Sequence, residues 1–117
     1  MARILNESGQ ELVPHVAVSR AFGRGNAKGL LGRRELPRGE GLLLHDPTGT
    51  IHMFFMRFAI DAVFLGPDLE VVKVAHALRP WRVARGKGAT RILEIAAGEA
   101  RRLGIDVGQR LQIEGES

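Results

Sequence analysis

The hydrophobic residues of this chain fall into short runs separated by turn-forming clusters, and this pattern predicts a fold built mainly of β-strands. The runs at 2–5 and 11–18 flank a polar cluster that contains Asn, Ser and Gly, so we expect a hairpin there. The runs at 61–65 and 70–78 flank a Gly-Pro-Asp turn and predict a second hairpin. Further strands are expected at residues 41–45, 50–55, 91–96 and 110–113.

Three local signals refine this outline. Pro14 cannot donate a backbone hydrogen bond, which places the second run at a sheet edge. Residues 19–32 hold four glycines, so we expect a short helix or an irregular arm there rather than a long helix. Residues 98–104 predict a helix of one or two turns, because Glu99 complements the helix dipole and Gly104 supplies a left-handed end.

These elements predict an α+β fold that is mainly β, with about seven strands and one or two short helices. The chain has 117 residues, which is the size of one domain, so a single domain over residues 1–117 is expected. In so small a protein, a small curved sheet or a closed barrel would bury the hydrophobic runs and protect the strand edges.

Composition excludes several kinds of site. The chain has no cysteine, which excludes disulfides, thiolate metal sites and a cysteine nucleophile.

The first apolar run, Ile4 and Leu5, is too short for a secretory signal. No stretch approaches the roughly 18 apolar residues that a membrane span needs. We therefore expect a soluble, cytoplasmic protein without a membrane span.

Basic residues gather in two segments, 15–39 and 79–102, within a chain whose formal net charge is +4. Such segments attract anions, so nucleic-acid binding is one alternative function. The chain has five Phe and one Trp, and all five Phe lie in apolar runs. Few rings would then be free for base stacking, which argues against nucleic acid as the partner.

The segment 52–64 mixes polar side chains with aromatic residues and supplies the first candidate site residues, His52, Met56, Arg57 and Asp61. In a strand Asp61 would share a face with Val63 and Leu65, and an unpaired carboxylate is costly to bury there. We therefore predict that its carboxylate is at least partly buried and hydrogen-bonded. Its expected partners are Arg57, Arg82 or the backbone amides of residues 57–60.

Metal and cofactor motifs are absent from the sequence. His52 and Met56 together would suit Cu(I), but Met is also common core filler. The four histidines lie on separate segments without the spacing of metal ligands. We therefore expect neither a metal nor a cofactor.

Trp81, Arg82 and Glu94 complete the candidate set. Trp81 is the chain's single tryptophan and lies in a predicted loop between two arginines. Such a ring can stack on a sugar, a base or a peptide while the arginines attract anions, or it can pack as a lid over one end of a barrel. Glu94 is a carboxylate inside the apolar run 91–96, and its direction depends on the strand's alternation.

Four longer motifs occur in a fixed order: GLLGRRELPRGEGLLL, IHMFFMRFAIDAVFL, LRPW and RILEIAAGEARRLGIDVGQRL. In these motifs the chain resembles the bacterial and archaeal family known as domain of unknown function 192, over residues 16–113. The resemblance implies a compact, β-rich, barrel-like domain without an established activity. The positions that match the family are Gly29, Leu30, Arg33, Gly41, Met56, Asp61, Glu94, Gly98 and Gly108.

The chain departs from that family pattern at two positions. Phe55 stands where many relatives carry Trp, and Gln109 stands where many carry Asp. The second departure weakens any requirement for a carboxylate at the last turn. Many relatives are exported behind a signal or a lipid anchor, and because no such segment is recognised here, that location is not expected for this chain.

Together these features favour a non-enzymatic binding or interaction module with its site at one end of a barrel. An unidentified small molecule, glycan or peptide would be the partner, and an anionic one would suit the arginines. One alternative is a hydrolase in which Asp61 and Glu94, roughly 5–10 Å apart, act as paired carboxylates. The other alternative is nucleic-acid binding through the basic segments. The candidate site residues are His52, Met56, Arg57, Asp61, Trp81, Arg82 and Glu94.

Overall fold

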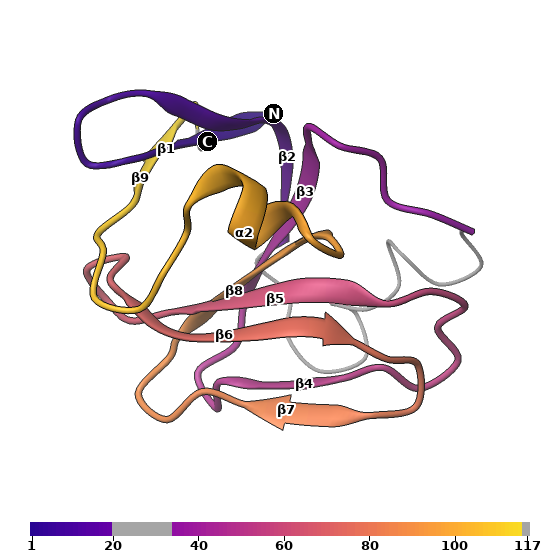
Figure 1. Cartoon of the computed structure of the whole chain (residues 1–117). Coiled ribbons are helices and arrows are strands. Elements are labelled where there is room, and N and C mark those ends of the chain that lie inside the picture. Colours follow the sequence, from indigo (N-terminus) through magenta and orange to yellow (C-terminus); the bar gives the residue numbers. More distant parts are fainter. Residues whose placement is uncertain (20–33, 116–117) are drawn as a thin grey trace.

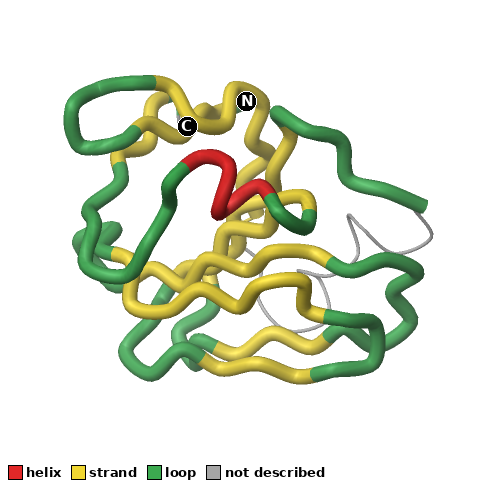
Figure 2. Tube along the Cα trace, viewed as in Figure 1, coloured by secondary structure: helices red, strands yellow, loops and turns green. Residues whose placement is uncertain are grey.

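The computed structural model describes residues 1–19 and 34–115, and these form a mainly β fold with one short helix, as the sequence predicts (Figures 1 and 2). The helix is α2 (Glu99–Leu103), flanked by Gly98 and Gly104, both with left-handed backbones. The strands are β1 (Ala2–Leu5), β2 (Glu11–Ser19), β3 (Glu40–His45), β4 (Thr50–His52), β5 (Ile60–Leu65), β6 (Val71–Leu78), β7 (Val83–Arg85), β8 (Arg91–Ala96) and β9 (Gln112–Glu114).

Seven strands form one curled sheet in the order β6-β5-β8-β3-β2-β1-β9, and β4 pairs with β7 in a separate two-stranded sheet. Both expected hairpins, β1–β2 and β5–β6, are present and antiparallel. The large sheet curls until its two ends approach each other, where Glu70 bridges to Arg110 and the Val71 N–H donates to the Gln109 carbonyl at 2.8 Å. The result is the curled half-barrel visible in Figure 1.

The expected edge position of Pro14 was wrong, because β2 lies between β1 and β3 inside the sheet. The β1–β2 register shifts between the pairs Ala2–Val16 and Ile4–Val13, which leaves Pro14 in a bulge. A bulge does not need the N–H that proline lacks, so the ladder tolerates the ring there.

Two further expectations changed in extent. The strand expected at residues 50–55 ends at His52, and turns follow it. The short helix or arm expected at residues 19–32 lies outside the described residues except for Ser19, which ends β2.

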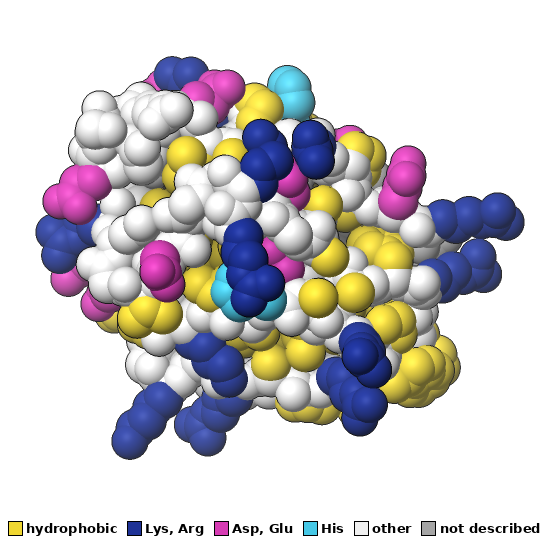
Figure 3. Space-filling model, viewed as in Figure 1, with side chains coloured by type: hydrophobic (Ala, Val, Ile, Leu, Met, Phe, Trp, Pro, Cys, Tyr) yellow, Lys and Arg dark blue, Asp and Glu magenta, His cyan; other side chains and the backbone are white. Residues whose placement is uncertain are grey.

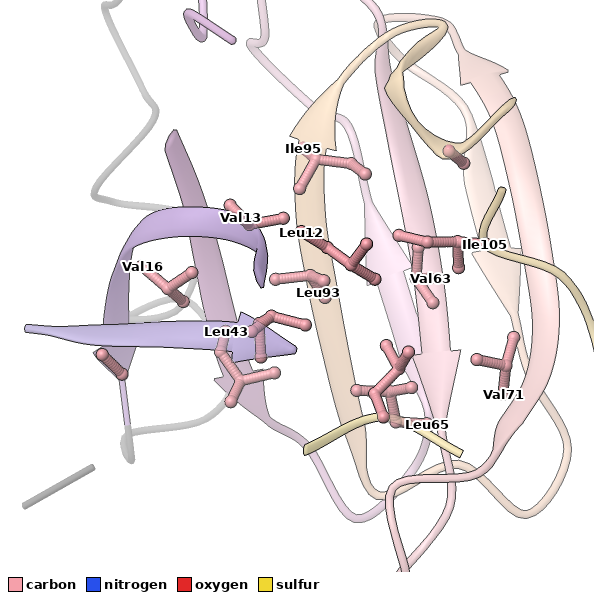
Figure 4. Packing of buried hydrophobic residues seen from close by; sticks show 14 residues of the cluster. Leu12, Val13, Val16, Leu43, Val63, Leu65, Val71, Leu93, Ile95 and Ile105 are labelled. Atoms are coloured by element: carbon pink, nitrogen blue, oxygen red, sulfur yellow. The ribbon is translucent and has the colours of Figure 1, made fainter. Parts of the chain in front are cut away.

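Two hydrophobic clusters lie on opposite faces of the sheet. Figure 4 shows part of the first, in which Val63 from β5 and Leu93 from β8 point toward side chains of β2 and β3. Ala100 from α2 belongs to this cluster, so the helix covers that face. The second cluster contains Phe64 from β5 and Ile51 from β4, so the β4–β7 sheet covers the other face. Within the residues that the structure describes, no helix is long and apolar enough to cross a membrane.

Candidate functional site

Two four-residue turns, 53–56 and 79–82, meet where β4 ends and β7 begins. The Met53 carbonyl accepts the Met56 N–H at 3.2 Å within its own turn and the Trp81 N–H at 2.7 Å from the other turn. The Met53 N–H donates to the Arg82 carbonyl at 2.8 Å, and the Arg82 N–H donates to the Arg79 carbonyl at 3.3 Å. Backbone hydrogen bonds therefore hold the two turns together.

Each turn carries an aromatic residue in a backbone conformation that normally favours glycine. Phe55 has φ +67° and Trp81 has φ +68°, and each occupies the third position of its turn. A positive φ at that position usually selects Gly or Asn, because the Cβ of other residues crowds the carbonyl, at a cost of about 1–2 kcal/mol per residue. The surrounding hydrogen bonds thus hold two bulky side chains in strained positions.

The aromatic side chains of these turns touch one another at the surface. The rings of Phe55 and Trp81 lie 4.8 Å apart at 59°, and Phe54 lies 6.1 Å from Trp81. His52 stacks on Phe54 at 4.7 Å. Exposure remains high, at 70% for Phe55 and 59% for Trp81. We call His52, Phe54, Phe55, Trp81 and the exposed Val83 the aromatic surface.

Positive charge surrounds the aromatic surface. Arg57, Arg79 and Arg82 are exposed and adjoin the two turns in sequence. The two stretches that build this region, 47–60 and 71–93, contain no Asp or Glu. In Figure 3 hydrophobic and basic side chains lie side by side over the right-hand end of β4 and β7. This part of the surface therefore combines apolar rings with basic side chains, which attract anions.

The structure brings four of the candidate residues, His52, Arg57, Trp81 and Arg82, to this one region. Met56 lies beneath it, 6% exposed, within the second hydrophobic cluster. Sequence reasoning missed Phe54 and Phe55, which it assigned to an apolar strand. Their exposure follows from the turn that begins directly after β4, and no residue in that turn is the glycine or asparagine that usually signals one.

Asp61 is fully buried, and both of its carboxylate oxygens accept backbone hydrogen bonds. Oδ1 accepts the N–H of Ala77 at 2.8 Å. Oδ2 accepts the N–H of Gly98 at 3.0 Å and that of Ala100 at 2.9 Å. The prediction of a buried, hydrogen-bonded carboxylate agrees with this geometry. Its partners differ from those expected, because they are amides of β6 and α2.

Asp61 also contacts β6 just before the turn that carries Trp81. Ala77, which donates to Asp61, has φ +49° and lies two residues before Arg79. That left-handed residue lies one position before the end of β6 and two positions before the turn at 79–82. The Asp61 carboxylate therefore holds the end of β6 just before this turn, and it is buried rather than exposed on the aromatic surface.

Glu94 lies on the opposite face of the sheet from Asp61. In the β5–β8 pairing Asp61 faces Ile95, whereas Ala62 faces Glu94, so the two carboxylates alternate to different sides. Glu94 is 3% exposed, and burial raises the pKa of its carboxyl from 4.5 to about 8. The paired-carboxylate hydrolase requires both groups in one cleft. The structure places them on opposite faces of the sheet, so that alternative was wrong.

A separate hollow of about 370 Å³ lies between β6, α2 and the loop that follows the helix. Its polar lining comes from His76, Arg101, Asp106 and Gln109. Gln109 was also missed as a structural residue: its amide donates to the Gly104 carbonyl at 2.7 Å and accepts the Asp106 N–H at 3.0 Å. Among the described residues, no group of three or more His, Asp or Glu side chains could hold a metal ion.

The sequence matches the model of the family DUF192, described as an uncharacterised group, over residues 4–113. A UPF0127 protein of Thermococcus sibiricus is 40% identical over 68 residues, covering 57% of this chain and 44% of the relative. A UPF0127 protein of Pyrococcus abyssi is 39% identical over 64 residues, 54% of each protein. The chain thus spans about half the length of the curated relatives it matches.

Two crystal structures share the fold. A protein of unknown function from Novosphingobium aromaticivorans superposes with a TM-score of 0.80 at 29% identity, covering 95% of this chain and 82% of that one. A candidate transcription regulator from Sinorhizobium meliloti superposes with a TM-score of 0.75 at 23% identity, covering 95% and 90%. The second likeness shows the fold alone.

Proposed function

Since the chain belongs to the DUF192 family, whose description names no activity, we propose from its own geometry that it is a non-enzymatic binding or interaction module. The aromatic surface, together with Arg57, Arg79 and Arg82, is the proposed contact region. The candidate residues Met56, Asp61 and Glu94 support that region or the sheet from inside, because all three are buried.

The observation that carries this proposal is the pairing of Phe55 and Trp81. Both side chains are mostly exposed, so neither contributes much to the hydrophobic core. Both also occupy positive-φ positions, where a glycine would relieve the strain. Strained residues of this kind cluster at ligand-contact sites, where the surrounding structure holds them for a purpose other than stability.

Binding is favoured over catalysis by the chemistry of the region. His52 stacks on Phe54, and its Nδ1 accepts the Phe54 N–H at 3.4 Å, which occupies one of its ring nitrogens. The Asp61 carboxylate is buried, and both of its oxygens accept backbone N–H groups. The remaining groups are rings and guanidinium groups, which bind and orient a partner but provide neither a nucleophile nor a general base.

The charge distribution favours an anionic partner. An acidic small molecule, glycan or peptide could place an apolar or planar group on the rings and a negative group beside the arginines. Acidic residues are absent from both stretches that build the region, so these stretches would not repel the negative charge of such a partner.

Trp81 provides the direct test, because it is the chain's single Trp and no Tyr is present. Its emission should be titrated with an acidic oligosaccharide, a polyglutamate peptide, a single-stranded oligonucleotide and anionic lipid vesicles. A saturable spectral shift that weakens with salt, and that Arg82→Ala reduces, would support the proposal. If Trp81 emission stays unchanged with every anionic probe, the proposed contact region is wrong.

A further inference from the structure

We infer that the partner of the aromatic surface is an anionic lipid bilayer, onto which the two turns dock from the water side. This inference rests on the proposed function and names its partner.

The first observation is the exposure of the rings, which line neither of the two hollows found among the described residues. Phe55 and Trp81 lie at the third positions of adjacent turns and expose 70% and 59% of their surfaces. The hollow of about 370 Å³ beside α2 and a second of about 260 Å³ beside the β1–β2 turn are lined by other residues. An exposed apolar tip suits an extended surface better than a small molecule, which needs a concave site.

The second observation is that the apolar tips and the cations lie together. Trp and Phe rings are favoured at the boundary between lipid headgroups and acyl chains, where an apolar ring body meets water. Exposed Val83 adds an aliphatic side chain to the rings. Arg57, Arg79 and Arg82 flank these tips, and arginine side chains can extend along a surface to place the guanidinium group among phosphates.

The wider charge pattern extends this arrangement. The stretch 71–93 carries Lys73, Arg85 and Lys87 as further exposed cations, with no acidic residue between Glu70 and Glu94. Anionic membrane surfaces attract clusters of basic residues over about a Debye length. The two stretches that carry the apolar tips are therefore of one charge sign, which is complementary to an acidic leaflet.

The third observation weighs against a glycan. Proteins hold sugar hydroxyl groups largely with carboxylate and amide side chains, which both accept and direct hydrogen bonds. The stretches 47–60 and 71–93 contain no Asp, Glu, Asn or Gln at all. The region can stack on a ring and attract phosphate, but it offers little to read a pattern of hydroxyl groups.

The test uses vesicles of phosphatidylcholine alone and of phosphatidylcholine mixed with phosphatidylserine, with the intact chain and Trp81 emission as the signal. We expect a blue shift with the mixed vesicles, little change with the neutral ones, and loss of binding at high salt. Vesicles that carry brominated acyl chains should quench Trp81, because the ring would lie at the acyl boundary.

Matched variants separate the rings from the charges. Phe55→Gly removes one tip at a position whose φ suits glycine, and we expect at least about tenfold weaker vesicle binding, equivalent to the transfer of roughly half a large apolar side chain. Arg79→Glu should weaken binding by at least about fivefold, which corresponds to one basic residue near the surface. Val107→Ala and Arg101→Glu are the controls, since these exposed residues lie outside the aromatic surface, and both should bind like the parent chain.

Three results would overturn the inference: equal binding to neutral vesicles, binding without quenching by brominated lipid, or equal loss in the control variants. The lipid partner alone would be refuted if the chain did not bind vesicles but its Trp81 emission shifted with a dissolved acidic peptide, oligosaccharide or oligonucleotide. The proposed binding function would survive that result. A chain that responds to no anionic probe would refute both.

Discussion

The buried carboxylate of Asp61 on β5 accepts the backbone N–H of Ala100, in the first turn of α2, at 2.9 Å. Thirty-nine positions separate the two residues, so a side chain from the sheet satisfies a helix terminus that has no capping side chain of its own. The first N–H groups of a helix lack intrahelical partners. Asp61 thus fastens the helix to the face of the sheet that it covers.

Replacing Asp61 should destabilise the fold in proportion to the acceptors removed. Asp61→Asn keeps one acceptor and should lower the free energy of unfolding by roughly 1–3 kcal/mol. Asp61→Ala strands all three donors and should cost about 3 kcal/mol or more. Urea unfolding measures both. Asp106→Ala is a suitable control, because its exposed carboxylate caps one local amide, and it should cost about 1 kcal/mol or less.

That explanation of Asp61 would be wrong if the Ala variant were as stable as the Asn variant. It would also fail if the Asp106 control lost as much stability as Asp61→Ala.

Stability should fall as pH rises from about 5 to 8, because of Glu94. Burial raises its pKa from 4.5 to about 8, so the folded state holds a proton that the unfolded state releases within this range. The contribution of the protonated carboxyl is complete below the unfolded pKa and is lost as pH rises through the folded pKa, by up to about 1.4 kcal/mol for each pH unit.

Glu94→Gln removes this titration and keeps a neutral side chain of the same shape. The variant should therefore match the parent chain near pH 5 and exceed it in unfolding free energy near pH 8. Denaturant unfolding at a series of pH values measures the difference. A parent chain and variant with parallel profiles would show that Glu94 does not ionise as burial predicts.

The strain at Phe55 can be measured by comparing two substitutions at that position. Phe55→Ala keeps a Cβ at φ +67°, whereas Phe55→Gly removes it. The Gly variant should be the more stable by up to about 1 kcal/mol, since the relief of left-handed strain exceeds the extra backbone entropy of glycine. Thermal and urea unfolding of both variants test this order. An Ala variant clearly more stable than the Gly variant would mean that the turn is not strained.

Gly86 follows β7 directly and lies against Phe64 of β5, where the close approach leaves no room for a side chain. A Cβ at Gly86 would lie 2.6 Å from the Cβ and Cγ of fully buried Phe64. Gly86→Ala should therefore destabilise the fold by roughly 1–3 kcal/mol through overpacking. Gly41→Ala, whose nearest contact would be 3.2 Å, should cost less. Equal losses for the two variants would show that the Phe64 contact relaxes freely.

The strand order shows which parts of the fold the local sequence pattern could predict. Both hairpins were predictable, because turn residues separate two apolar runs that are adjacent in sequence. The helix at Glu99–Leu103 was equally visible from Glu99 and the glycines that flank it. Pro14 misled the prediction, because the bulge that accommodates it exists only in the register between β1 and β2.

The candidate site was partly visible in the same way. His52, Arg57, Trp81 and Arg82 stood out by residue type, but nothing in the sequence indicated that turns 53–56 and 79–82 meet. That meeting depends on the Met53 carbonyl, which accepts N–H groups from both turns. The exposure of Phe54 and Phe55 follows from it and could not be read from an apolar run.

By itself the sequence determined the β-rich class, the two hairpins, the short helix and the need to satisfy the carboxylate of Asp61, because these follow from periodicity, turn chemistry and the cost of burying charge. Only the tertiary structure decided which amides satisfy Asp61, that Glu94 lies on the other face, and that Phe55 and Trp81 form one exposed surface. Each of these depends on pairing between residues distant along the chain. Strand register and long-range backbone hydrogen bonds set such pairing, and they leave no local signal at the residues they bring together.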